Sequence, residues 1–276
     1  MTKKGTNKFI GVFDSGFGGL NILRGIVKDL PDFNYIYLGD TARAPYGTRS
    51  QEVVYEFTRQ AVDFLFSKNC ELVIIACNTA SSDALRKIQQ EYLPKHYPGK
   101  KVLGVLIPAV EEAVQRTKNK RVGVMATEGT VQSGAFVREL TKLDPKIKVF
   151  QKACPLLVPL VEAGEHNSEV ANFILQNYLR PLLQKNSDTL ILGCTHYGIL
   201  EKKIRVIVGP KVQIISGLKI VAEKLKNYLK RHADIETKLG KNRVIRFYST
   251  DLTDKFQVLG SKFFGKTITV QKAILH

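Results

Sequence analysis

Two cysteines lie in matching places of a nine-residue segment that the chain contains twice. Residues 71–79 read ELVIIACNT, and residues 188–196, 117 positions later, read DTLILGCTH. Each copy has an acidic residue, an apolar run, a small residue, a cysteine and two residues that can form hydrogen bonds. Because such apolar runs are typical of central strands in a parallel sheet, Cys77 and Cys194 are expected just past the carboxyl ends of two strands. Open α/β sheets bind their ligands at that edge.

Two thiols in equivalent places on two halves of one chain favour symmetric chemistry on a single substrate. Inversion of a carbon centre needs such a pair, because one base removes a proton and a second group returns a proton from the opposite face. A thiol suits both roles, since its ordinary pKa of about 8.5 lies near working pH and helix N-terminal amides favour its thiolate. The site must also stabilise the carbanion and exclude water. We therefore expect a two-thiol isomerase, and the substrate stays open.

Three other uses of these thiols compete with acid–base chemistry. A free cysteine is most often a small buried hydrophobe, but a repeated pair followed by hydrogen-bonding residues favours function. Cys194-x-His196 resembles a pair of zinc ligands, yet the chain has no close C-x2–4-C pair, so no metal site is expected. A redox dithiol would need C-x-x-C. Cys70 and Cys154 are expected to be structural, and no lysine lies in a recognisable pyridoxal site, so we expect no cofactor.

Two further residues are candidates because of their places beside the thiols. Asp14 ends an expected strand, and a carboxylate beside a thiol can relay a proton or bind an ammonium group. The following turn, residues 16–19 (GFGG), lacks the full dinucleotide-binding pattern and is expected to bring backbone amides close to a carboxylate. His196 lies two residues past the second thiol, which favours a place in the pocket. Glu162 and Asp40 have no repeat behind them and, taken alone, are ordinary loop acids.

Strands and helices alternate along the whole chain, which predicts an α/β protein. Ser50 is expected to cap a helix whose apolar residues recur at helical spacing from Val54 to Leu65. Besides the two cysteine strands, strands are expected at 8–13, 35–38, 102–106, 147–150 and 244–248. Further helices are expected at 20–29, 81–92, 110–117, 167–183, 218–230 and 254–264.

A second repeat, together with the first, indicates an internal duplication. Residues 121–130, RVGVMATEGT, resemble the segment around Asp14 and Ser15 displaced by 112 positions. The second copy has Ala126 in place of Asp14 and Thr127 in place of Ser15. The thiols are thus repeated, but the acid beside the first thiol is not.

This duplication predicts the domain organisation. Two repeats cannot form a solenoid. We therefore predict two similar open α/β lobes, related by pseudo-two-fold symmetry, with the active site between them. The C-terminal stretch is expected to pack back on the first lobe, which then comprises 1–101 plus 217–276, while the second lobe comprises 102–216.

Composition limits the class of protein. The chain has 276 residues, of which 44% are hydrophobic and 24% are charged, and these values are typical of a soluble globular protein. Its N-terminus lacks the apolar run of a signal peptide, and no apolar run approaches the ~18 residues of a membrane span. The four cysteines are therefore expected to be free thiols in a cytoplasmic protein without membrane contact.

The net charge of +17 is uneven, because residues 201–276 hold 17 Lys and Arg against 6 Asp and Glu residues. A basic surface can bind nucleic acid by releasing counterions. These lysines are scattered, however, and no nucleic-acid-binding motif accompanies them. We favour a solvated basic face, and nucleic-acid binding stays a less favoured alternative.

Five motifs, in order along the chain, resemble the glutamate racemases, cofactor-independent members of the aspartate/glutamate racemase family. They are GVFDSGFGGL at 11–20, GDTARAPYG at 39–47, ACNTA at 76–80, CPLLVPLVE at 154–162 and LGCTHY at 192–197. The resemblance runs from about residue 9 to 265. It implies interconversion of L- and D-glutamate without a cofactor, supply of D-glutamate for peptidoglycan, and a homodimer. Gly198 departs from the proline that the family usually has after the last motif.

The resemblance also implies roles for the residues that match these motifs. Cys77 and Cys194 would be the two catalytic acid/bases, with Asp14 assisting Cys77 and with Glu162 and His196 assisting Cys194. A racemase for aspartate or another amino acid stays open, because one sequence does not determine the depth of a pocket. The residues implied to bind the substrate are Asp14, Ser15, Tyr46, Gly47, Asn78, Thr79, Thr127, Thr130, Thr195 and His196.

Overall fold

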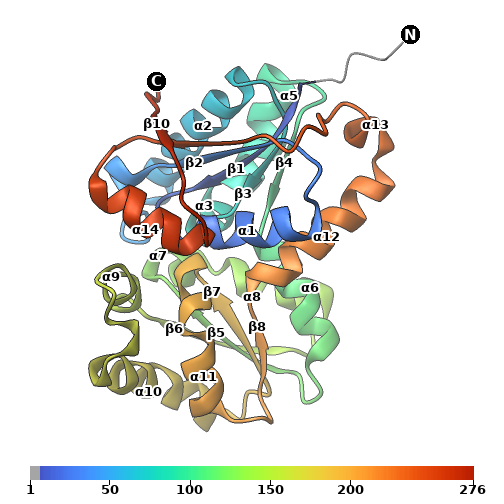
Figure 1. Ribbon diagram of the computed structural model, residues 1–276. Helices are drawn as coiled ribbons and strands as arrows, with labels where there is room; N and C mark the ends of the chain where they lie inside the picture. The colour runs from blue at the N-terminus through green and yellow to red at the C-terminus, as the bar shows by residue number, and fades with distance from the viewer. Residues whose placement is uncertain (1–6) are drawn as a thin grey trace.

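Two parallel β-sheets, one in each of two lobes, form the framework of the molecule (Figure 1). The computed structural model describes residues 7–276. The six-stranded sheet has the order β10-β9-β2-β1-β3-β4 and the four-stranded sheet the order β6-β5-β7-β8, with all neighbours parallel. The predicted α/β fold with two lobes is confirmed. The strands are β1 Phe9–Asp14, β2 Tyr35–Gly39, β3 Cys70–Ile75, β4 Lys101–Gly104, β5 Arg121–Ala126, β6 Lys148–Ala153, β7 Thr189–Gly193, β8 Gln213–Ile215, β9 Ile245–Ser249 and β10 Val270–Lys272.

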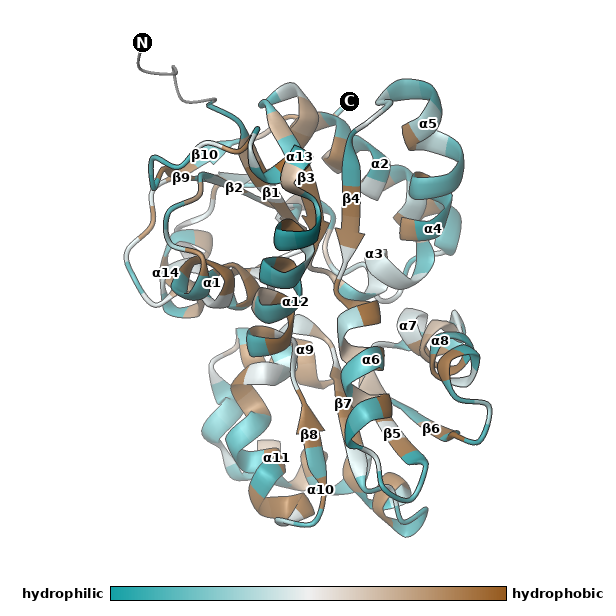
Figure 2. Ribbon diagram, turned by 90° about the vertical axis from the view of Figure 1, so that its right-hand side faces the viewer, coloured by the Kyte–Doolittle hydropathy of each residue, from teal (hydrophilic) through white to brown (hydrophobic). Residues whose placement is uncertain are grey.

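The two repeats of the sequence occupy equivalent places in the two sheets. β1 pairs with β3 in the first sheet, while β5 and β7, which repeat them, pair in the second. Phe13 lies opposite Ile75 in the first pair, and Ala126 lies opposite Gly193 in the second. β1, β3 and β7 are buried along their whole length, and Figure 2 shows hydrophobic residues concentrated along the strands. Residues that follow paired strands therefore emerge side by side.

The C-terminal part of the chain returns to the first sheet, as expected. β9 pairs with β2, and β10 pairs with β9. Helices α12 (Gly217–Arg231) and α14 (Asp254–Phe264) both pack on α1 (Gly19–Asp29). The predicted lobe boundaries themselves stay a prediction, and β4 continues the first sheet three residues past the boundary at 101/102.

Most long helices begin and end close to the expected residues. Besides α1, α12 and α14, these are α2 (Gln51–Ser67) and α10 (Glu169–Gln184). Ser50 caps α2 as predicted, because its hydroxyl oxygen accepts a hydrogen bond from the Val53 amide at 3.4 Å. No helix within residues 7–276 is both long and apolar enough to cross a membrane.

Two expected helices begin earlier than predicted. The helix expected at 81–92 begins at Asn78, because extended Cys77 is its N-cap, and the first helical amides therefore lie directly after the thiol. It is divided into α3 (Asn78–Asp83), α4 (Leu85–Lys87), a π-helical turn (Ile88–Tyr92) and α5 (Leu93–His96). The helix expected at 110–117 is α6 (Leu106–Arg116), in which Pro108 falls in the first turn, where no amide needs an intrahelical partner.

Several short elements lie where no element is expected, and three of them adjoin candidate site residues. α7 begins after Thr127, α9 ends with Glu162, and a 3₁₀ helix begins after Cys194. The short helices are α7 Glu128–Gln132, α8 Ala135–Leu143, α9 Leu157–Glu162, α11 Glu201–Val208 and α13 Ala233–Glu236, with 3₁₀ helices at Thr41–Arg43, Glu165–Asn167 and Thr195–Leu200.

Candidate active site

Residues that follow the strands of the two lobes meet where the lobes face each other. Thr79 follows β3 and hydrogen bonds Thr127, which follows β5, with 3.0 Å between their Oγ1 atoms. Thr195, which follows β7, donates a hydrogen bond to Asp14 at the end of β1, with 3.4 Å from Oγ1 to Oδ1. Both strand pairs thus present their carboxyl ends to one interface, between the upper and lower lobes of Figure 1.

Cys77 is a buried thiol at the N-terminus of α3. Its Sγ lies 3.4 Å from the hydroxyl oxygen of Ser15. Burial and, to a smaller extent, the negative charge of Asp14 together raise the pKa of Cys77 to about 12, although the hydrogen bonds of Ser15 and Ala80 lower it in part. This side chain is therefore a thiol that can donate a proton.

Cys194 is less buried and has a different set of neighbours. Its Sγ lies 3.9 Å from Nδ1 of His196, and Nε2 of His196 lies 3.0 Å from Oε1 of Glu162. Burial lowers the pKa of His196, but its contacts with Cys194 and Glu162 outweigh burial and raise the pKa to about 10. The His196 imidazole connects the Cys194 thiol with the Glu162 carboxylate, so this half of the site can move a proton through His196.

Asp14 lies between the two halves rather than beside Cys77 alone. It is buried, and its carboxylate accepts hydrogen bonds from Thr195 and, at 3.0 Å, from the Gly16 amide. Burial raises the pKa of Asp14, while the charge of His196 opposes the rise. A buried carboxylate with few partners can bind a cation such as an ammonium group.

The glycine turn at 16–19 allows close packing between the two lobes. A Cβ atom on Gly18 would lie 2.2 Å from Oγ1 of Thr195, and one on Gly19 would lie 2.5 Å from Cβ of Asp14. The Gly16 amide binds the carboxylate of Asp14 itself. The turn therefore lets the first lobe approach the segment after Cys194.

Three threonine hydroxyls form a cluster across the interface. Oγ1 of Thr79 lies 3.0 Å from Oγ1 of Thr127 and 3.3 Å from Oγ1 of Thr130, and Thr127 and Thr130 are themselves 3.0 Å apart. Asn78 and Thr195 line a cavity of about 130 Å³ that also reaches Cys194. These residues thus lie at the interface between the lobes, where the strands that precede the two thiols also end.

Gly47 reaches the interface through its backbone. The carbonyl oxygen of Gly47 accepts a hydrogen bond from the Gly129 amide at 2.8 Å, and a Cβ atom on Gly47 would lie 2.7 Å from Cβ of Thr127. The Tyr46 ring is buried and its hydroxyl donates to Asp40 at 2.5 Å. The side chain of Tyr46 therefore anchors the loop to Asp40.

Three residues near the site were not predicted from the sequence as site residues. The Tyr37 hydroxyl donates to the carbonyl oxygen of Gly16 at 2.8 Å, and the Phe263 ring meets the His196 ring edge-on at 5.6 Å. Asp40 is buried at the end of β2. Its place after a parallel strand is the signal that could have indicated it, since Asp14 and Cys77, at the ends of neighbouring strands, lie in the candidate site.

This arrangement can carry out proton transfer at one carbon from two sides. One thiol lies beside a buried acid and the other beside a histidine–carboxylate pair, and hydroxyls and amides surround both. No group of three His, Cys, Asp or Glu side chains within residues 7–276 is placed to hold a metal ion.

Comparison with known proteins agrees with this geometry. A family model described as Asp/Glu/Hydantoin racemase matches residues 11–225. The chain is 38% identical over 259 residues to a glutamate racemase of Geobacter metallireducens, which covers 94% of this chain and 93% of that protein. The structure of the present chain is similar to that of a glutamate racemase isoform from Bacillus anthracis, with a TM-score of 0.89. It is also similar to that of glutamate racemase from Francisella tularensis in complex with D-glutamate, with a TM-score of 0.88. Each of the two is 34% identical to this chain, and each comparison covers 98% of both chains. The chain therefore belongs to the Asp/Glu/Hydantoin racemase family.

Proposed function

We propose that this protein is a glutamate racemase, which interconverts L- and D-glutamate at the α-carbon without a cofactor. The observation that carries this proposal is the position of Cys77 and Cys194 after equivalent strands of two facing lobes. Relatives named glutamate racemase that align with more than nine-tenths of the chain support glutamate as the substrate.

The reaction proceeds by two proton transfers on opposite faces of the α-carbon. In one direction the thiolate of one cysteine takes the α-proton, so that an S–H bond forms while the Cα–H bond breaks and leaves a carbanion. The thiol of the other cysteine then gives its proton to the opposite face. The two cysteines exchange roles in the reverse direction, and each can recover its starting state by proton exchange with water.

The helpers of the two thiols differ. Asp14 assists Cys77, and the pair of His196 and Glu162 assists Cys194. A substrate ammonium group beside Asp14 would offset the negative charge that helps to raise the pKa of Cys77. Substrate binding therefore brings this thiol closer to the thiolate form that it needs as a base.

The substrate's charged groups are held mainly by uncharged hydrogen-bonding groups. The proposed contacts are Asp14, Ser15, Tyr46, Gly47, Asn78, Thr79, Thr127, Thr130, Thr195 and His196. None is a lysine or arginine, so amide and hydroxyl donors bind the carboxylates, and Asp14 is the counter-ion of the ammonium group. Such donors can also stabilise negative charge as it develops on the substrate during proton removal.

The alternative within this family is a racemase for aspartate or another amino acid. Circular dichroism of each amino acid during incubation with the protein distinguishes them, because racemisation abolishes the optical signal. We expect turnover of glutamate in both directions. Turnover of aspartate with none of glutamate would refute the proposed substrate.

The wider setting is proposed on the same basis. D-Glutamate made by this enzyme would enter peptidoglycan, in the cytoplasm, where the four free cysteines stay reduced. We also propose a homodimer. Sedimentation equilibrium with and without glutamate tests the dimer, which a mass of 30.9 kDa at all concentrations would exclude.

A further inference from the structure

The loop of residues 41–47, which ends with Tyr46 and Gly47, is held by one buried carboxylate. We propose that Asp40 is a positioning residue, which holds this loop against the second lobe and makes its geometry depend on Thr250 near the C-terminus. The inference rests on the proposed function, because Tyr46 and Gly47 are substrate contacts only in that proposal.

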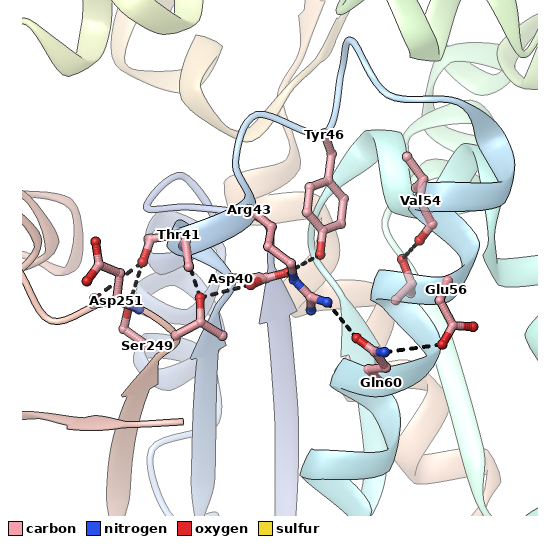
Figure 3. Close-up of polar contacts among 12 residues, drawn as sticks. Asp40, Thr41, Arg43, Tyr46, Val54, Glu56, Gln60, Ser249 and Asp251 are labelled. Atoms are coloured by element: carbon pink, nitrogen blue, oxygen red, sulfur yellow. Dashed lines mark hydrogen bonds and ion pairs between the residues drawn. The ribbon is translucent and has the colours of Figure 1, made fainter. Parts of the chain in front are cut away.

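Asp40 accepts hydrogen bonds from three side chains, two from its own loop and one from the C-terminal part of the chain. Figure 3 shows Asp40 together with the two loop residues, Arg43 and Tyr46. Oδ2 accepts from the Tyr46 hydroxyl at 2.5 Å and from Nε of Arg43 at 2.7 Å. Oδ1 accepts from the hydroxyl of Thr250 at 2.8 Å. Asp40 is completely buried, so these donors replace water around its charge.

Tyr46 attaches the loop of residues 41–47 to Asp40. Its ring is buried against Phe13 and Phe57, with ring centroids 6.2 Å and 5.6 Å apart. Burial and the charge of Asp40 raise the pKa of Tyr46, so the phenol stays neutral and keeps donating. The backbone at Gly47, one residue further on, then meets the Gly129 amide of the second lobe.

Arg43 balances the charge of Asp40 and fixes the loop to α2. Its guanidinium lies over the Phe57 ring, 4.0 Å from the centroid, and Nη1 donates to Oε1 of Gln60 at 2.5 Å. Gln60 in turn donates to Glu56 at 3.2 Å. Removal of the Asp40 carboxylate would leave the half-buried guanidinium without its charged partner.

The third donor connects the loop to a segment more than 200 residues away. Thr250 follows β9, and its hydroxyl both donates to Asp40 and accepts from the Ala42 amide at 3.0 Å. Thr41 makes separate contacts with this segment, namely with Ser249 at 2.7 Å and with the carbonyl oxygen of Asp251 at 3.3 Å. These contacts do not pass through Asp40, so Thr41 provides a matched control.

The experiment compares Asp40→Asn and Thr250→Val with Thr41→Val in the full-length protein. Wild-type racemisation of glutamate is measured first, followed by KM and kcat for each variant and by hydrogen exchange of the Gly129 amide. We expect Asp40→Asn to lower kcat/KM roughly 100-fold, because the loop contacts move away from the substrate. Thr250→Val should give a smaller loss, and Thr41→Val, which leaves the hydrogen bond between Thr250 and Asp40 in place, should lose less than Thr250→Val.

Hydrogen exchange reports on the loop without any turnover. The Gly129 amide should exchange faster in Asp40→Asn and Thr250→Val than in the wild type, because its acceptor on Gly47 is no longer held in place. Asp40→Asn and Thr250→Val remove the same hydrogen bond, so their effects should not add. The variant that carries both substitutions should therefore lose less kcat/KM, expressed as free energy, than the sum of the two single losses. If Asp40→Asn fails to fold, Thr250→Val carries the test alone.

An active wild type whose Asp40→Asn variant keeps its kcat/KM and its slow Gly129 exchange would overturn the positioning role and leave the proposed function intact. With an unfolded Asp40→Asn variant, unchanged values for Thr250→Val have the same meaning. A wild type that does not racemise glutamate refutes the proposed function, and the inference falls with it.

Discussion

Thr195, the residue directly after Cys194, donates a hydrogen bond to Asp14, the acid that we propose assists Cys77. The two side chains belong to different lobes and both are buried. The two halves of the acid–base machinery are therefore in contact with each other. A change at this contact is expected to affect proton transfer at both thiols.

The first prediction concerns the packing of Gly18 against Thr195. Gly18→Ala should lower kcat/KM for glutamate roughly 100-fold, because the new Cβ atom would lie 2.2 Å from the Thr195 hydroxyl and displace it. Gly198→Ala is the control, since its Cβ atom would lie 3.6 Å from Ser216, an ordinary contact. Steady-state kinetics of both variants provides the test, and equal kcat/KM values would contradict the importance of this close packing.

The two-thiol mechanism predicts that loss of one cysteine affects racemisation and exchange of the α-proton differently. Cys77→Ser and Cys194→Ser should each lower racemisation by roughly 10²–10⁴-fold, because each removes one of the two proton carriers. Each variant should still exchange the α-proton of one enantiomer with deuterium from solvent through its remaining cysteine. Polarimetry and mass spectrometry measure the two reactions. Full racemisation by either single variant would exclude the scheme.

The contact between His196 and Glu162 predicts a pH dependence of stability. The pKa of His196 is raised from 6.5 to about 10 in the folded protein, so its contribution to the free energy of unfolding is complete below about pH 6.5. This contribution is lost as the pH rises towards 10. Glu162→Gln should lower the pKa of His196 and shift the loss of stability to lower pH.

NMR titration of the histidine ring, together with thermal unfolding between pH 6 and pH 11, measures both effects. Glu165→Gln is the matched control, because Glu165 lies three residues further along and its carboxylate has no contact with His196 among the described hydrogen bonds. A wild-type His196 that titrates near pH 6.5 would contradict the charged imidazole in this account.

The acidic residue that opens the first cysteine segment predicts acid sensitivity. Burial raises the pKa of Glu71, but hydrogen bonds from Lys100, Lys8 and Lys238 outweigh burial and lower the pKa to about 2. The resulting stabilisation is complete above about pH 4.5 and is lost as the pH falls towards 2. Glu71→Gln should lower the free energy of unfolding at pH 7 by about 1–3 kcal/mol.

Urea denaturation at pH 7 and pH 3 measures this difference, which should be smaller at pH 3. Glu236→Gln is the control, because Glu236 pairs with Lys241 on the surface and such pairs contribute about 0–1 kcal/mol. Equal losses for Glu71→Gln and Glu236→Gln at pH 7 would show that the three lysines do not stabilise the fold through Glu71.

The elements that a repeated apolar pattern specifies could be predicted from the sequence. The apolar runs predict both cysteine strands, and the duplication predicts two lobes that face each other. The return of the C-terminal stretch to the first lobe is predicted as well. The acidic residues at 71 and 188 belong to the same repeat but are structural. Asp188, for example, accepts hydrogen bonds from Thr117 and from the amides of Lys118 and Asn119, each at 2.7 Å.

Contacts between distant segments could not be predicted in the same way. The hydrogen bond from Thr250 to Asp40 joins residues 210 positions apart, and neither residue belongs to a repeat or a period. The ring of Phe263 against His196 is a similar case. Short helices such as α7 and α9 are not predictable from the sequence either, because five or six residues are too few to show a helical period.

The central claim is that two thiols act on opposite faces of one carbon, and deuterium incorporation tests it most directly. Each enantiomer of glutamate is incubated separately with the wild-type protein in deuterium oxide, and early samples are separated by chirality and analysed by mass spectrometry. We expect deuterium at the α-carbon of the product from the first turnovers, because the thiol that donates to the product has exchanged with solvent. The remaining substrate should keep its own α-proton. Early product that retains the substrate's own α-proton, from either enantiomer, would contradict two bases and indicate that a single group removes and returns the proton.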